Sequence, residues 1–232
     1  MEHIQRILGI WLSPVKTFDT FPRQMVTPQW LIPLIIILVF LSATTYISTP
    51  YIKDMQVEMI QSNPDISDDQ REVMLERMNS EFAVYFAIVA SIVGALFKYL
   101  LLSGIIFGIG TLILGIDSSF KTIWAMIILI NTTNLIELAI KVPIIISSSN
   151  LILETSLSLL LPSSLTETFV YNFLYQFDIF SIWRVILIGL GLSIVHNTER
   201  TKTYSILFGL WVVYALISAV LMDKFGLFMM RG

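Results

Sequence analysis

Residues 82–114 read FAVYFAIVASIVGALFKYLLLSGIIFGIGTLIL, an apolar stretch that contains a single charged residue, Lys98. A helix needs about 20 predominantly apolar residues to cross the hydrocarbon core of a bilayer. Since this stretch is longer than one crossing requires, its outer turns are expected to project from the membrane. It predicts a transmembrane helix over 88–114.

Similar apolar blocks recur on both sides of this stretch and predict an all-α, polytopic membrane protein. Of the 232 residues, 56% are hydrophobic and 13% are charged, whereas soluble domains carry about 25% charged residues. The expected architecture is a bundle of five transmembrane helices accompanied by short interfacial helices. The five predicted spans cover residues 30–48, 88–114, 122–146, 179–195 and 204–222.

The composition also excludes several classes of function. With a net charge of −3 and no basic run, the chain offers nucleic acid no binding surface. It has no cysteine and two histidines, so neither a metal site nor a cofactor is expected. Because no catalytic motif of a hydrolase, a nucleotide-binding enzyme or an intramembrane protease occurs, we expect a protein that is not an enzyme.

The leader, residues 1–29, predicts a short amphipathic helix that ends at Pro14. Two interpretations stay open, a helix that lies on the membrane surface and a helix that packs against the bundle. The apolar residues at helical spacing are Ile4, Ile7, Leu8, Trp11 and Leu12.

Two connections and a tail complete the predicted organisation. The acidic loop, 49–81, is expected to be helical and exposed to water. Asn63 and Pro64 end one helix there, and Ser67 with Gln70 can form a capping box that starts the next, which would run into the second span. The segment 147–176 is predicted to be interfacial; its apolar run, 151–161, is too short to span and is either interfacial or re-entrant. Residues 223–232 form the tail.

Basic residues near the span ends predict the orientation. Lys121, Arg200 and Lys202 lie in tight connections on one face of the bundle, while the segment 147–176 on the other face has no basic residue. Cytoplasmic loops carry an excess of lysine and arginine. The N-terminus is therefore expected in the cytoplasm and the C-terminus outside it.

Polar residues inside the spans are the candidate site, because such residues are costly in a membrane and need a partner. Counted from the inner ends, Lys98 of the second span and Glu137 of the third lie at matched depth. At 100° per residue, one side of the third helix carries a polar stripe. The expected intramembrane cluster is Lys98, Asn131, Asn134, Glu137 and Lys141.

Two interpretations of this cluster stay open. In the first, a salt bridge between Lys98 and Glu137, with asparagine hydrogen bonds, fixes the register of the helices. In the second, Glu137 titrates and Lys98 tunes it, in an ion or proton pathway or in a site for a polar headgroup. Lys141 and Arg184 lie near the outer boundary and are expected to reach it without taking part in chemistry.

Small residues form a second pattern. Gly104 and Gly108 make a GxxxG pair in the second span, and Gly189 and Gly191 recur in the fourth. Small faces let helix backbones approach closely, so both pairs are expected at helix contacts. Whether the neighbouring helices belong to this chain, to a second copy or to another protein stays open.

Three motifs resemble the bacterial branch of the Yip-domain (Ypt-interacting protein) family of multi-pass membrane proteins. They are LSPVKTF over 12–18 before the first span, GIDSSFK over 115–121 between the second and third, and FDIFSIWRVILIGLGL over 177–192 in the fourth. The resemblance covers essentially the whole chain and rests on the order of the motifs relative to the spans. The motif positions are Ser13, Pro14, Lys16, Phe18, Gly115, Ser119, Phe120, Lys121 and Trp183.

The resemblance implies a five-helix bundle in a bacterial cell membrane and an adaptor with no known catalysis. Some bacterial relatives look like companions of ABC-type exporters, in assembly or in protection against toxic peptides. The partners it implies are other integral membrane proteins, including ABC exporter subunits, alongside the membrane lipids.

Two other functions are kept beside the adaptor. One is a small transporter or channel subunit built on Lys98 and Glu137. The other is a lipid-binding or bilayer-shaping protein that uses the amphipathic leader and the segment 151–161.

Overall fold

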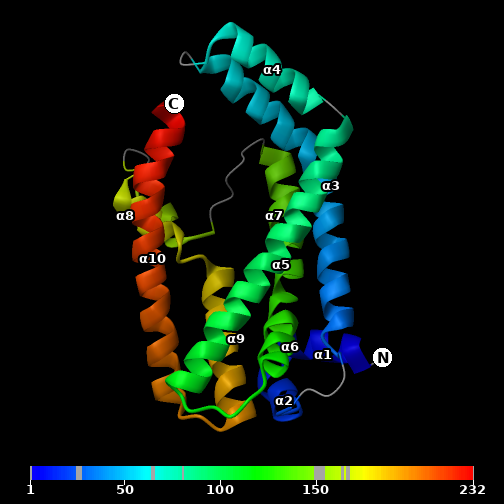
Figure 1. Ribbon diagram of the computed structural model, residues 1–232, viewed down its shortest axis with the longest axis vertical. Coiled ribbons are helices and arrows are strands. Elements are labelled where there is room, and N and C mark those ends of the chain that lie inside the picture. The colour runs from blue at the N-terminus through cyan, green and yellow to red at the C-terminus, as the bar shows by residue number, and fades with distance from the viewer. Residues whose placement is uncertain are drawn as a thin grey trace.

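The computed structural model is all-α, as the sequence predicts, and describes residues 2–24, 28–63, 66–79, 81–148, 155–162, 165 and 168–231. Among these residues, five helices or helix pairs are long and apolar enough to cross a membrane, which confirms the predicted fold class. They run roughly antiparallel to one another along the long axis of the molecule (Figure 1). The chain therefore begins at one end of the bundle and finishes at the other.

The first span continues well beyond its predicted end. Helix α3 (Leu31–Ser62) contains the predicted span 30–48, passes through Pro50 and carries the chain away from the bundle. It is followed by α4 (Asp68–Asn79) and then by α5 (Glu81–Leu112), which contains Lys98. The expectation that one helix runs from the capping box into the second span is wrong, because α4 and α5 are separate helices.

The turn between α3 and α4 forms through local hydrogen bonds. The Ser67 amide donates to Gln70 Oε1 at 3.3 Å, and the Gln70 amide donates to Ser67 Oγ at 3.4 Å. This reciprocal pair is the predicted capping box. Arg71 then donates to the carbonyl oxygens of Ile60 and Asn63 at the end of α3, so its guanidinium ties the two helices together.

The third span is the most buried of the five and is broken in its middle. Helix α6 (Phe120–Asn131) ends at Thr132, and α7 (Thr133–Ser148) continues in a similar direction. The hydroxyls of Thr132 and Thr133 donate to the carbonyl oxygens of Leu129 and Ile130, at 2.7 and 2.9 Å. Side-chain bonds of this kind compete with the helical ladder and favour a bend at this turn.

The last two spans are α9 (Ile179–His196) and α10 (Arg200–Arg231). Between α7 and α9, the chain forms the short helices η1 (Leu157–Leu160) and α8 (Phe169–Tyr175). Helix α8 packs against α10 at the end opposite the N-terminus (Figure 1). Part of the predicted segment 151–161, residues 151–154, lies outside the described residues.

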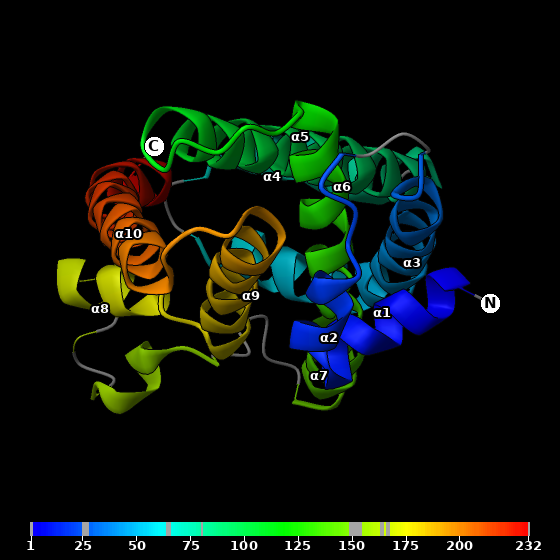
Figure 2. The same ribbon diagram turned by 90° about the horizontal axis from the view of Figure 1, so that it is seen from below.

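The leader folds into α1 (Glu2–Leu12) and α2 (Pro14–Asp19), which lie at the end of the bundle where the chain starts. Figure 2, viewed along the bundle, shows α9 between α10 and α2. Ile7 and Ile10 of α1 are buried in the core, while Ile4, Leu8 and Leu12 are exposed. The helix thus packs against the bundle through one apolar face and keeps a second apolar face outward.

The core where these helices meet is centred on α6. Met126, Ile127 and Ile130 are completely buried there, together with Leu187 of α9 and Phe18 of α2. Burial of these apolar side chains fixes α9 against α6 near the end of the bundle where the chain starts. The first turns of α9, toward the opposite end, are consequently held beside α7, where the polar residues lie.

Candidate functional site

The polar site begins with the cap of α9. Asp178 precedes the apolar helix, and its Oδ1 accepts hydrogen bonds from the amides of Phe180 and Ser181, at 2.8 and 3.3 Å. An aspartate at this position satisfies amides that have no partner within the helix. The other oxygen, Oδ2, accepts from the Thr155 hydroxyl and from Lys141 Nζ, the latter at 3.2 Å.

These contacts keep Asp178 ionised at neutral pH. Burial of the carboxyl group opposes ionisation, but the hydrogen bond from Thr155, the charge of Lys141 and the amide of Phe180 outweigh it. The pKa of Asp178 is therefore held below its ordinary value. The carboxylate is a fixed negative charge where α9 begins.

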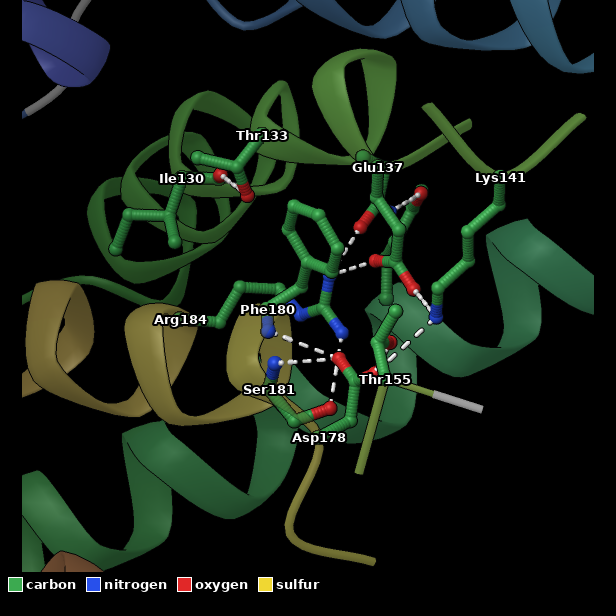
Figure 3. A network of polar contacts seen from close by, with 11 residues as sticks. Ile130, Thr133, Glu137, Lys141, Thr155, Asp178, Phe180, Ser181 and Arg184 are labelled. Atoms are coloured by element: carbon green, nitrogen blue, oxygen red, sulfur yellow. Dashed lines mark hydrogen bonds and ion pairs between the residues drawn. The ribbon is translucent and has the colours of Figure 1, made fainter. Parts of the chain in front are cut away.

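Glu137 is the centre of the site (Figure 3). Its Oε1 accepts from Lys141 Nζ at 2.7 Å, one turn along α7, and its Oε2 accepts from the Arg184 guanidinium of α9 at 2.5 Å. The three side chains are only 15 to 20% exposed. Each oxygen of Glu137 thus faces a cation, and the network joins α7 to α9.

Asn134 extends the network from α7 to α5. Arg184 donates to Asn134 Oδ1 at 2.7 Å, and Asn134 Nδ2 lies 2.9 Å from the Tyr99 hydroxyl. Arg184 also donates to Ser181 Oγ at 3.0 Å. A continuous line of hydrogen bonds consequently connects three spans at the same depth.

The predicted salt bridge between Lys98 and Glu137 is wrong. Lys98 forms no ion pair or hydrogen bond with any residue that the structure describes, and Glu137 binds Lys141 and Arg184 instead. The expectation that these two cations reach the outer boundary stays a prediction, although both of them pair with Glu137. The sequence pattern of α7 gives the direction of its polar stripe but not which neighbouring helix faces it, and that helix is α9.

Asn131 is separated from the rest of the expected cluster. It is buried, and its Nδ2 donates to the carbonyl oxygen of Ile127 in its own helix, at 2.8 Å. The break at Thr132 separates α6 from α7, so residues before and after it do not follow one helical wheel. The structure therefore brings together Asn134, Glu137 and Lys141 of the predicted stripe.

A cavity of about 250 Å³ lies beside this network. Residues of α3, α5, α7 and α9 line it, and Lys98 is among them although it does not touch Glu137. The lining residues are Ile37, Leu41, Ser91, Ala95, Lys98, Tyr99, Asn134, Leu135, Glu137, Leu138 and Arg184.

Four residues of the site were absent from the predicted cluster. Tyr99, Thr155, Asp178 and Arg184 all contact its members. For Asp178 a signal exists in the sequence, because aspartate directly before an apolar helical run is typical of an N-cap. For Tyr99 and Thr155 no sequence pattern indicates the contact, since both meet the network only through the packing of distant segments.

The two glycine pairs differ in their surroundings. A Cβ atom at Gly104 or Gly108 would meet no described atom within 4 Å. At Gly191 it would lie 2.6 Å from Met126 Sδ and 3.0 Å from the Phe18 ring, and at Gly189 it would overlap the Tyr204 ring. Gly189 and Gly191 therefore serve packing within the chain, whereas Gly104 and Gly108 face outward from α5.

The first two sequence motifs lie at one end of the bundle, and the third runs along α9 toward the same end. Phe18 of the first motif packs on Gly191 of the third, which joins α2 to α9. In the second motif, Gly115 has φ of 68°, a conformation that favours glycine, and Ser119 caps α6 by accepting from the Thr122 amide.

The remaining motif residues lie nearer the surface. Phe120 packs its ring against Phe107 and Trp124, which joins α6 to α5. Pro14 occupies the first turn of α2. The side chains of Ser13, Lys16, Lys121 and Trp183 are exposed.

The model of the Yip1 domain matches residues 8–222, from α1 through all five predicted spans. No curated protein and no solved structure matches the chain. Since the match covers nearly the entire chain, this membrane protein belongs to the Yip1-domain family.

Proposed function

We propose that the protein is a non-enzymatic accessory protein that binds another membrane protein through the outward face of α5. The observation that carries this proposal is the position of Gly104 and Gly108, which meet no described atom within 4 Å. A GxxxG pair on an open helix face lets a second helix approach closely. The pair is thus available for a helix from outside the chain.

The neighbourhood of this pair supports the same function. Leu101 and Ile105, which flank the glycines, are 54% and 51% exposed, so apolar side chains border the glycine face of α5 on both sides. In a membrane, van der Waals packing against such a face drives association, because lipid and leucine are equally apolar. A partner is therefore expected to contribute a transmembrane helix, as a subunit of an ABC-type exporter or a second copy of this chain would.

The proposed orientation in a cell membrane has the N-terminus in the cytoplasm and the C-terminus outside. It is supported by five exposed basic residues at the end of the bundle that holds α2 and the α5–α6 and α9–α10 connections (Figure 1). Positive charge is enriched on the cytoplasmic side of membrane proteins. These residues are Lys16, Arg23, Lys121, Arg200 and Lys202.

The experiment is a pull-down of the tagged full-length protein from its native membrane in mild detergent, with mass spectrometry of the co-purifying proteins. We expect a membrane complex, such as exporter subunits, in stoichiometric amounts. Gly104→Leu and Gly108→Leu should release it. Gly209→Leu is the matched control, because Gly209 of α10 also has no described atom within 4 Å of its Cβ position.

Two results would contradict the proposal. One is a protein that purifies alone from its native membrane. The other is a partner that is lost equally with Gly209→Leu, since the glycine face of α5 would then have no special role. Ion flux in liposomes, with wild type and Glu137→Gln, then tests the alternative of a transporter or channel subunit.

A further inference from the structure

The hydrogen bonds beside the cavity have a fixed direction. Arginine can only donate, so the oxygen of Asn134 must face Arg184 and its amide nitrogen must face Tyr99. Tyr99 accepts that bond with its hydroxyl oxygen, and its own hydrogen is left without an acceptor among the described residues. The line of bonds from Arg184 therefore ends in a donor at the cavity wall.

The acceptors of the network are already used. Both oxygens of Glu137 face cations, and Asp178 is bound by Lys141, Thr155 and the amides of its own helix. The charges of Lys141 and Arg184 are thus balanced by those of Glu137 and Asp178. A cation would find no unpaired carboxylate in this part of the cavity.

Lys98 stands outside this balance. It lines the cavity, its side chain is exposed, and it lies within the span Phe82–Leu112. An amine inside a span is costly and is normally paired or directed into a polar cavity. Lys98 and Tyr99, adjacent in the chain, thus both line the cavity, and each has a donor without an acceptor among the described residues.

We propose that this cavity binds an oxyanion, a phosphate or carboxylate group, with Lys98 and Tyr99 as its donors. Ile37, Leu41 and Leu138 line the same cavity and can contact the carbon atoms next to the charged group. A volume of about 250 Å³ has room for a group of several heavy atoms together with water. That volume suits an anionic head with a few attached carbons rather than a whole lipid.

The oxyanion can come from two sources, a lipid headgroup that enters sideways from the bilayer or a small anion from water. The lipid experiment mixes the detergent-purified full-length protein with equal amounts of phosphatidylglycerol and phosphatidylcholine and counts bound lipids by native mass spectrometry. We expect the anionic lipid to be retained in preference. The phosphate of phosphatidylcholine is the weaker competitor because its own choline group compensates its charge.

Variants connect this preference to the cavity. Lys98→Gln should weaken retention about tenfold or more, because a hydrogen bond to a charged group is lost, and Tyr99→Phe should weaken it less. Lys98→Arg should keep the preference. Lys121→Gln is the matched control, since it removes the same charge from an exposed site at the end of the bundle.

The small-anion experiment measures thermal unfolding with inorganic phosphate and no added lipid. Stabilisation of the wild type but not of Lys98→Gln by phosphate identifies a soluble source, and stabilisation by phosphatidylglycerol alone identifies a lipid. A second variant, Lys98→Met, is the folding control. Without any anion it should unfold at the same or a higher temperature than the wild type, which shows that the chain folds without the Lys98 amine. The proposal is overturned if neither anion is preferred over its control or if Lys98→Gln binds as well as the wild type.

Discussion

The glycine pairs of α5 and α9 are both expected at helix contacts from the sequence, but their surroundings differ in the structure. Gly189 and Gly191 lie against Tyr204, Met126 and Phe18, so their missing side chains let α9 approach α10, α6 and α2. Gly104 and Gly108 on α5 have no such neighbour among the described residues. Close packing explains the first pair, whereas nothing within the described chain explains the second.

Gly191→Leu should have the largest effect, because it places a branched side chain where Met126 and Phe18 already lie. Overpacking a well-packed core costs about 1 to 3 kcal/mol and occasionally more, and we expect a loss of at least about 3 kcal/mol here. Thermal unfolding in detergent measures it. Gly209→Leu is the control, and equal melting temperatures for the two variants would contradict internal packing at Gly191.

Glu137→Ala should have the next largest effect. It leaves Arg184 and Lys141 without their shared carboxylate, and the removal of one partner from a buried ion pair costs about 3 to 5 kcal/mol. We expect the lower part of that range, because Asp178 still binds Lys141 and Asn134 still binds Arg184. The change in unfolding free energy is the measurement.

A double variant tests whether Glu137 and Arg184 stabilise the fold through their mutual ion pair. If Glu137→Leu is combined with Arg184→Met, no buried charge is left unpaired at this point, and the loss should be smaller than that of Glu137→Ala. If the loss of unfolding free energy in the double variant equals the sum of the losses in the two single variants, the two side chains do not interact. Lys98→Met is the control within the same cavity, because Lys98 has no described partner to lose.

The sequence predicts the spans well because their signal is local. Twenty apolar residues in a row need a membrane whatever surrounds them, and the capping box at Ser67 and Gln70 involves only residues three apart. The break at Thr132 is harder to predict, since threonine hydroxyls bond to carbonyls in straight helices as well. It depends on the environment of that turn, where Trp11 of α1 donates to the Thr132 hydroxyl at 3.1 Å.

Only part of the candidate site could be predicted from the sequence, because only part of its signal is local. The polar stripe of α7 follows from helical periodicity, which correctly indicates that Asn134, Glu137 and Lys141 share a side. The choice of partner depends on which helix lies opposite. Arg184 faces the polar stripe because α9 packs on α6 and α2, and these contacts join residues far apart in the sequence.

Gly104→Leu and Gly108→Leu should have the smallest effect on folding, and its sign should be opposite to that of Gly191→Leu. Leucine favours a helix over glycine by up to about 1 kcal/mol, and no described atom occupies the space that the new side chain takes. The purified variants should therefore unfold at the wild-type temperature or slightly above it, while the partner is lost from the pull-down. A fall in melting temperature comparable to that of Gly191→Leu would mean that this face of α5 is filled within the folded chain. Wild-type stability with loss of the partner would assign the α5 pair to association and the α9 pair to folding.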